Sequence, residues 1–271
     1  GIDAPGISAM AKAIRDLGYW MWNTVEFRGF LDALRAHNAA HPGATIRVLG
    51  FDVQDTQAAC DLLLATAPLS PSERALLERL APERGRRALS FTSSDADQLD
   101  ALLARLAVIQ VGDGLDTASN RGALAALELT YRLATLRSDA VEGQRQRDVG
   151  MARVVAAVAS LAPQARILAL AHNGHLGREP YSTVPSMGEV LHAQLGAAYY
   201  PVGLFSVAGE AWAWNPAGTR REAVPLMPAP LHTLEATLTR SSPDRPMFVH
   251  LKASPTALQA WMALPRYVRE F

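Results

Sequence analysis

Apolar side chains recur at helical spacing along several stretches of the sequence. Between Phe27 and Leu34 they occupy positions i, i+3, i+4 and i+7, which predicts an amphipathic helix with Asn23 or Thr24 as its N-cap. This helix is expected to end within residues 37–43, where Pro and Gly interrupt the pattern. The same periodicity predicts further helices over 7–17, over 147–161 and from Met187 onward.

A second pattern consists of short, continuous apolar runs, which are typical of strands buried on both faces of a sheet. Such runs predict strands over 45–52, 167–171, 199–207 and 247–251. Because helical and strand segments alternate, the expected fold is α/β, with a mostly parallel sheet flanked by helices.

The segment 55–140 has a different character, since it is mostly helical, rich in Ala and Leu, and punctuated by Arg, with breaks near 67–71, 92–94 and 111–114. No group of catalytic residue types stands out within it. We therefore expect 1–54 and 141–271 to form the α/β core, and 55–140 to form a helical insertion or cap on it.

Composition narrows the class of protein. Apolar residues make up 49% and charged residues 19% of the chain, which is typical of a globular protein, and the formal net charge is zero. A neutral chain gives no sign of a nucleic-acid or membrane partner, and no apolar run reaches the roughly 20 residues of a membrane span. A single cysteine, Cys60, fits a reducing compartment, so we expect a cytoplasmic protein. Its sequence context is helical, which favours a small buried residue over a nucleophile. The basic residues of the chain are nearly all Arg, as in proteins from GC-rich bacterial genomes.

The strongest functional signal is the pair of histidines that follows the apolar run 167–171. His172 and His175 lie three residues apart, at what we predict to be the carboxyl end of a strand, where α/β proteins collect catalytic groups. Such a pair can provide a base and an electrophile for hydrolysis, and it can also bind zinc if further ligands come from elsewhere. A single histidine there could equally well cap the backbone. The pair favours a function, and the sequence contains no Gly-x-Ser-x-Gly element of a serine hydrolase and no phosphate-binding Gly-rich motif.

Five more residues are candidates for substrate binding. Arg147 could bind a carboxylate or carbonyl oxygen, or could be an ordinary charge at a helix start. Asp52 ends the first predicted strand and either faces the same crevice or caps a turn. Glu26 could serve only the helix dipole, Asn173 is expected to orient the turn or a water molecule, and Met187 opens the helix after the histidines.

Six short motifs, in this order along the chain, resemble those of the erythromycin esterase family. They are Trp22-x-Thr24-x-Glu26, Gly50-Phe51-Asp52, Arg147-Asp148-x-x-Met151-Ala152, His172-Asn173-x-His175, Met187-Gly188-x-x-Leu191 and Tyr200-x-x-Gly203. Each motif is weak apart from His-Asn-x-His, but their order and spacing together are specific.

The resemblance implies a hydrolase with an α/β core and a helical insertion, which in the resistance enzymes opens the macrolactone ester of macrolide antibiotics. It also implies a water molecule activated by histidine, with no acyl-enzyme on serine. His172 and His175 would line the cleft, holding water or polarising the ester carbonyl. The family's early His-Gly-x-x-Glu-Phe type motif, which supplies the base, does not occur in this chain, and Val154 stands where the family tends to have Asn.

We therefore predict an erythromycin-esterase-like hydrolase that acts on a small-molecule carboxylic ester without a cofactor. Because the sequence starts with Gly1 and lacks the early motif, we expect the central and C-terminal part of an esterase, weakly active or inactive alone. One alternative is a metal-dependent hydrolase in which the histidine pair binds the ion. A second is a non-catalytic relative that binds a hydrophobic ligand, with Trp212, Trp214 and Tyr181 lining the site.

Overall fold

The structure is a computed structural model of the chain. It describes residues 22–54, 56–80, 92–109, 114–178, 184–206, 208–215, 217–231 and 233–240. The chain divides into two compact units, 1–201 and 202–271. The predicted helix over 7–17 and the predicted strand over 247–251 lie outside the described residues.

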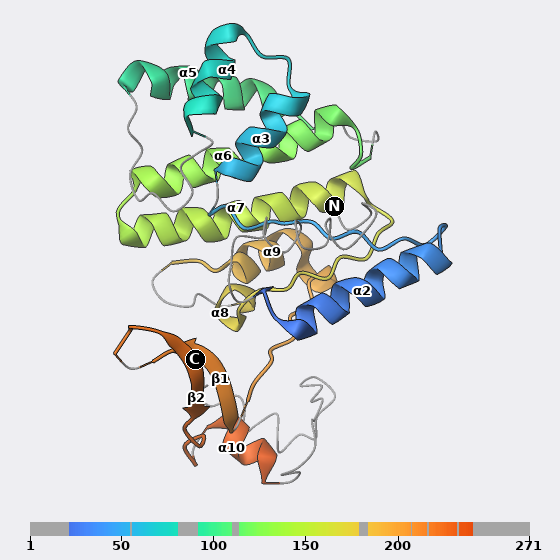
Figure 1. Cartoon of the computed structure of the whole chain (residues 1–271), viewed down its shortest axis with the longest axis vertical. Helices are drawn as coiled ribbons and strands as arrows, with labels where there is room; N and C mark the ends of the chain where they lie inside the picture. Colours follow the sequence, from blue (N-terminus) through green and yellow to red (C-terminus); the bar gives the residue numbers. More distant parts are fainter. Residues whose placement is uncertain are drawn as a thin grey trace. The chain divides into compact units, whose positions relative to one another are not determined.

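The described part of the first unit is built from helices joined by turns and extended segments (Figure 1). In chain order they are α2 (Val25–Ala40), α3 (Gln57–Thr66), α4 (Pro71–Leu80), α5 (Ser93–Leu106), α6 (Ala118–Arg137), α7 (Ala140–Leu161), α8 (Asn173–Leu176), α9 (Met187–Leu195) and the 3-10 helix η2 (Gly196–Ala198). None of the helices in the described ranges is long and apolar enough to cross a membrane.

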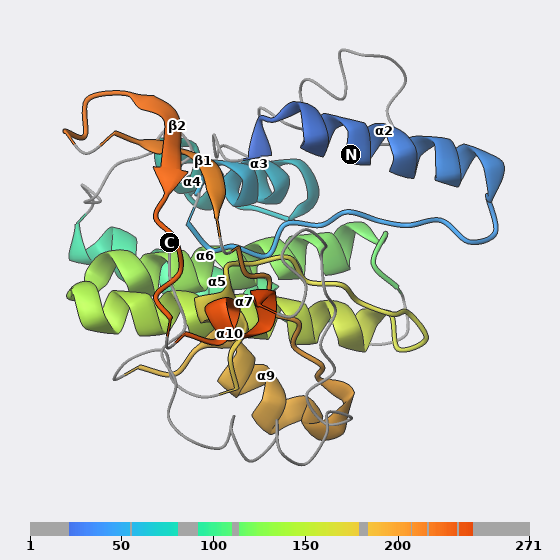
Figure 2. The same cartoon turned by 90° about the horizontal axis from the view of Figure 1, so that it is seen from below.

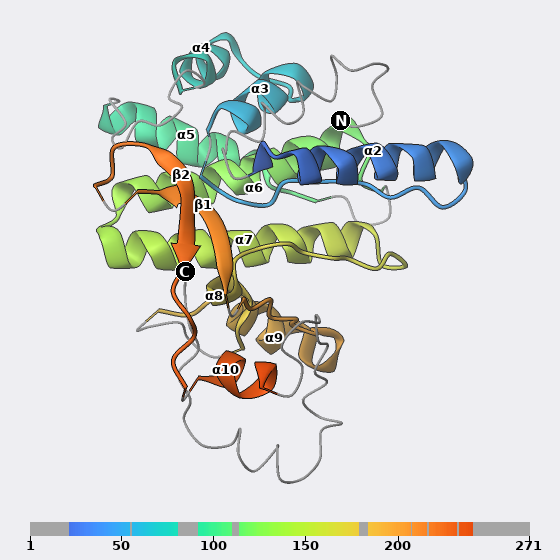
Figure 3. The same cartoon turned by 60° about the horizontal axis from the view of Figure 1, so that its bottom comes forward.

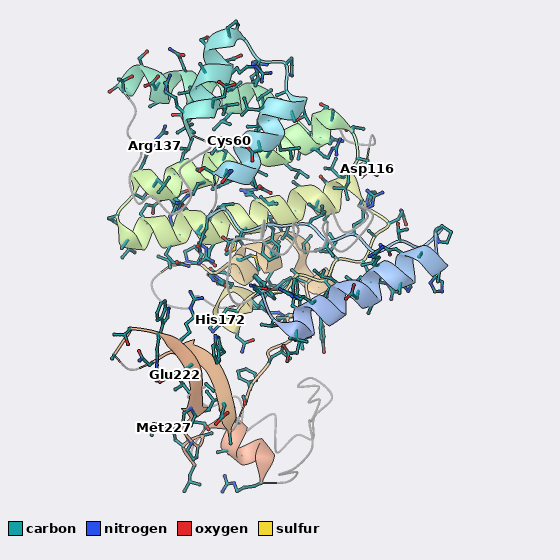
Figure 4. The ribbon with its side chains drawn as sticks, viewed as in Figure 1. Cys60, Asp116, Arg137, His172, Glu222 and Met227 are labelled. Atoms are coloured by element: carbon teal, nitrogen blue, oxygen red, sulfur yellow. The ribbon has the colours of Figure 1, made fainter. Side chains whose placement is uncertain are left out.

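Helices α3 to α6 surround one apolar core. Its largest members are leucines that present one face of each helix inward, as the helical periodicity of the sequence requires. The core consists of Ala59, Cys60, Leu63, Leu76, Leu77, Leu80, Leu99, Leu102, Leu103, Ala125, Ala126, Leu129 and Leu133. Figure 4 shows Cys60 on α3 within this group, and its burial confirms the helical, packed position expected for it.

The two longest helices, α6 and α7, pack side by side (Figures 1 and 2). A Cβ added at Gly150 of α7 would lie 2.6 Å from Cβ of Tyr131 on α6, so glycine is what permits this close approach. Helix α7 begins at Ala140, seven residues before the predicted start at residue 147. Asp139 caps it by accepting hydrogen bonds from the backbone N–H groups of Val141 and Glu142. Its first two turns are polar, so apolar periodicity did not reveal them.

Helix α2 confirms its prediction. Thr24 is the N-cap, with its hydroxyl accepting from the backbone N–H of Phe27, and His41 is the C-cap. Helix α9 likewise begins at Met187, where the hydroxyl of Ser186 caps it.

The predicted parallel sheet is wrong for the described residues. Segments 45–52, 167–171 and 199–206 form no strand. The sheet found among the described residues is a two-stranded antiparallel one formed by 209–214 and 221–226. A strand is defined by hydrogen bonds to a neighbour, so a strand-like sequence can remain extended and unpaired. Helices α3 to α6 occupy much of 55–140, and their status as an insertion stays a prediction.

The second unit contains a hairpin and a short helix (Figure 3). Strand β1 (Gly209–Trp214) pairs with β2 (Arg221–Leu226) in a register that places Trp214 opposite Arg221. The guanidinium carbon of Arg221 lies 4.9 Å from the centroid of the Trp214 ring, a cation–π contact. Helix α10 (Leu234–Thr239) follows.

Candidate active site

The central feature of the site is a buried pair between two helices. His175, on the short helix α8, places its Nδ1 2.7 Å from Oδ1 of Asp148 on α7. The His175 side chain is 18% exposed and that of Asp148 only 4%. Two residues separated by 27 positions in the sequence are thus held at hydrogen-bond distance.

Asp148 is satisfied from three directions. The backbone N–H of Met187, at the start of α9, donates to Oδ1 over 3.0 Å, and the Gln144 amide donates to Oδ2 from one turn earlier on α7. The free N–H groups and partial positive charge at a helix N-terminus favour a carboxylate there. Asp148 is therefore a carboxylate with a fixed position, and α7, α8 and α9 meet at it.

This arrangement determines how the His175 ring is oriented. Because both Asp148 oxygens accept hydrogen bonds from N–H groups, the carboxylate acts as acceptor toward Nδ1, and the neutral ring carries its proton on Nδ1. Nε2 then has an available lone pair, and it has no partner among the described residues. The sequence predicted His175 as a site residue, but it did not include Asp148.

A glycine makes the meeting of α8 and α9 possible. A Cβ at Gly188 would lie 2.3 Å from the carbonyl oxygen of Gly177 and 2.4 Å from that of Leu176. Two other contacts reinforce the same junction: the Tyr199 hydroxyl donates to the carbonyl of Leu176, and the Ser186 hydroxyl donates to that of Gly177. The Met187-Gly188 motif therefore provides an N–H for Asp148 and room for the end of α8.

His172 has a different environment from His175. It is the N-cap of α8, and its Nδ1 accepts a hydrogen bond of 3.2 Å from the backbone N–H of Gly174 (Figure 4). The structural use expected of a single histidine at this place is to cap backbone carbonyls, whereas here the ring accepts from a backbone N–H. His172 is exposed, so the two rings share a helical turn while only His175 contacts Asp148.

Arg147 and Asp52, both predicted as substrate-binding residues, bind each other. The Arg147 Nε and Nη2 donate to Oδ1 and Oδ2 of Asp52 at 3.0 and 2.9 Å, a bidentate pair. The two side chains are 21% and 32% exposed. Since Arg147 and Asp148 are adjacent on α7, this pair lies next to the His175–Asp148 pair.

A third carboxyl group belongs to this neighbourhood. Glu128, on α6, is partly buried, and burial together with the negative charge of Asp52 raises its pKa from 4.5 to about 7. Nothing in the sequence pattern singled out Glu128, because its proximity to Asp52 depends on how α6 packs on α7.

The remaining predicted residues take ordinary structural positions. Glu26 lies exposed in the first turn of α2, where it suits the helix dipole. The carbonyl of Asn173 accepts from the backbone N–H of Gly177 at the end of α8. Met187 contributes its backbone N–H to Asp148, while its side chain is buried among Met151, Ala152, Val155 and Leu191.

The described residues contain no group of three or more His, Cys, Asp and Glu side chains placed to hold a metal ion. Gln144 and Asp148 are the site residues that the sequence prediction omitted. Their spacing of four along α7 is a recognisable helical signal, but it becomes informative only once the helix is known to begin at Ala140.

The fold is similar to that of a protein from Bacillus cereus known from a crystal structure, with a TM-score of 0.69 and 17% sequence identity. The match covers 88% of the present chain and 63% of the Bacillus chain, so this chain spans less than two thirds of that protein. No curated protein sequence matches.

The class of fold that the described helices and the hairpin define is a mixed α/β one. A sequence model of the erythromycin esterase family matches residues 2–271, and the chain therefore belongs to that family.

Proposed function

We propose that this protein is a carboxylic ester hydrolase in which His175 activates the attacking water. The observation that supports this most directly is the buried Asp148 carboxylate on Nδ1 of His175, which leaves Nε2 as the basic nitrogen. Membership of the erythromycin esterase family suggests a hydrolase independently of this geometry.

The chemistry follows from the ring orientation. Nε2 takes a proton from water as the oxygen attacks the ester carbonyl carbon, and the protonated ring then gives that proton to the leaving alkoxide. Asp148 stabilises the imidazolium that forms in between. Polarising the carbonyl would instead require a proton on Nε2, so the geometry favours the role of base over that of electrophile.

The roles of the neighbouring residues follow from their contacts. Arg147, held by Asp52, presents a fixed cation beside the base, and we propose that it binds an oxygen of the ester. His172 and Asn173 shape the turn that carries His175, and His172 is the further candidate for a water contact. We also propose that Glu26, in the first turn of α2, contacts the substrate.

The substrate we propose is a small-molecule ester, with a macrolide lactone as the first to test and antibiotic resistance in a bacterium as its setting. We further propose that the family's early His-Gly motif, absent here, supplies an additional base, so the 271 residues alone hydrolyse esters weakly.

The test compares hydrolysis of a p-nitrophenyl ester and of erythromycin by the chain and by the protein expressed with its upstream codons. His175→Gln should lower the rate by about 10²–10⁴-fold. The matched control is His192→Gln on α9, whose Nδ1 lies 3.2 Å from the carbonyl oxygen of Gly196, and it should leave the rate unchanged. Hydrolysis that survives His175→Gln would refute the assignment of the base, and tight macrolide binding without turnover would favour a binding protein.

A further inference from the structure

Two glutamines near the start of α7 have amide groups that donate to different partners. The Gln146 amide donates to Oε1 of Glu142, which also binds Arg145, so it belongs to a network of half-exposed side chains. The Gln144 amide donates instead to Oδ2 of Asp148, and its side chain has no second hydrogen-bond partner among the described residues. Gln144 is exposed, whereas the Asp148 side chain is buried. The Gln144 amide therefore covers this carboxylate on its solvent side.

The two oxygens of Asp148 receive different donors. Oδ1 faces Nδ1 of His175 and the backbone N–H of Met187, while Oδ2 accepts from Gln144. The last torsion of an aspartate side chain has a broad energy minimum, so hydrogen bonds decide where its carboxylate points. Gln144 is thus the donor that fixes this torsion from the oxygen that His175 does not contact.

The neutral charge of the amide matters as much as its position. A cation at Oδ2 would neutralise Asp148, and an anion there would add a second negative charge. The neighbouring cation, Arg147, is engaged by Asp52 in a bidentate pair. An uncharged donor at residue 144 therefore satisfies Oδ2 and leaves the negative charge of Asp148 to act on the ring of His175.

We propose that Gln144 is a positioning residue of the candidate active site. It holds the Asp148 carboxylate in the orientation that accepts from Nδ1 of His175, and so controls when that ring is neutral and able to act as a base. The effect on ester hydrolysis rests on the proposed function, whereas the effect on the ring can be measured without a substrate.

The test depends on assigning any change to residue 144 and not to another charge. Helices α6 and α9 pack on α7, and α8 packs on α9. Charged or titratable groups of these surroundings include Asp52, Glu128 on α6, Arg147 on α7, His172 on α8, and Glu189 and His192 on α9. All of them are the same in every variant compared below.

The first test is Gln144→Glu, which places a second carboxylate beside Oδ2. Two neighbouring negative charges favour the imidazolium, so the titration of the His175 ring, followed by NMR, should shift upward by about one pH unit. The acid limb of the kcat/KM profile should move with it. The control is Gln146→Glu, whose amide faces Glu142 in the wild type, and it should move neither curve. A His175 titration that is the same in Gln144→Glu and wild type would overturn the proposal.

The second test moves the negative charge by one hydrogen bond. In the double variant Gln144→Glu/Asp148→Asn, the new carboxylate accepts from the new amide N–H, while the amide oxygen still faces Nδ1 of His175 and the N–H of Met187. The charge is thereby returned to the network, and kcat should be about 10-fold above that of Asp148→Asn alone. Gln146→Glu/Asp148→Asn should stay at the level of Asp148→Asn. Equal kcat values in the two double variants would overturn the proposal.

The two tests separate this inference from the esterase assignment. If the wild type hydrolyses no ester, the proposed function fails, and the NMR titration still decides whether Gln144 controls the ring. If hydrolysis depends on His175 but its titration ignores Gln144→Glu, the proposed function stands and this inference fails.

Discussion

The helices α3 to α6 and the extended residues 45–50 and 166–171 bury their apolar side chains to very different extents. In the first, the leucines of four neighbouring helices, consecutive among the elements described, bury one another, and Leu63, Leu77, Leu99 and Leu129 are all fully buried. In the extended segments most apolar side chains are exposed, while Phe51 and Ala171, at the ends of these segments, pack against a buried cluster on α7 and α9.

The difference shows what each kind of element needs. A helix satisfies its own backbone and requires only a neighbour for one face, so helices close together in sequence can complete a core locally. A strand requires a hydrogen-bonded partner along at least one edge, and in a parallel sheet that partner comes from distant sequence. The candidate site lies on α7, which packs on α6, and on α8, which follows the extended residues 166–171.

The largest effect is expected at this junction, from Asp148→Asn. The backbone N–H of Met187 and Nδ1 of His175 both face Oδ1, so the amide oxygen takes that position and the negative charge that stabilises the His175 imidazolium is lost. The kcat for ester hydrolysis should fall by about 10²–10⁴-fold with little change in KM. Asp139→Asn, which keeps a good N-cap on the same helix, is the control and should retain full activity. A wild-type kcat in Asp148→Asn would contradict a role for Asp148 of α7 in catalysis.

The contrast between the two cores predicts the next effect. Leu129→Ala removes a fully buried side chain from the helical core and should lower the free energy of unfolding by about 2–5 kcal/mol. Leu170→Ala, at a residue 47% exposed in the extended segment 166–171, should lower the free energy of unfolding of the 271-residue chain by less than about 0.5 kcal/mol. Urea denaturation measures both. Equal losses of unfolding free energy would mean that residues 166–171 are as well packed as the helical core.

The pKa of Glu128 predicts a pH dependence at the boundary of α6 and α7. Because this pKa is raised from 4.5 to about 7 in the folded protein, folding favours the protonated form. The contribution of Glu128 to the free energy of unfolding is therefore fully present below pH 4.5 and is lost as the pH rises through 7.

Glu128→Gln imitates the protonated form, so it should match wild type at pH 4 and exceed its stability by up to about 3 kcal/mol at pH 8. Chemical denaturation across this pH range gives the comparison, with Glu78→Gln at an exposed position of α4 as the control. A stability difference that does not change with pH would show that Glu128 is ionised in the fold throughout.

The smallest expected effect concerns Gly188. An alanine there meets two backbone carbonyls of α8 and should cost about 1–3 kcal/mol while moving Met187 away from Asp148. Gly29→Ala on α2, where a Cβ would meet nothing within 4 Å, should instead stabilise by about 0.5–1 kcal/mol. Thermal unfolding distinguishes them, and a neutral Gly188→Ala would mean that α8 and α9 can separate without cost.

Several elements of this protein could be predicted from its sequence because their signals are local. The cap at Thr24, the start of α9 at Met187 and the helical burial of Cys60 each depend on residues within a turn or two. The first seven residues of α7 were missed because its polar residues carry no apolar period, and with them the alignment of Gln144 and Asp148 was missed.

The sequence by itself determined where helices such as α2 and α9 begin, and it singled out His175 as a candidate, because both depend on short-range pattern. Only the tertiary structure decided that Asp148 holds His175, that Arg147 is engaged by Asp52, and that Glu128 lies near that pair. The strand-like segments likewise remain unpaired in the described residues. Such contacts join residues dozens of positions apart, and their formation depends on packing that no local pattern encodes.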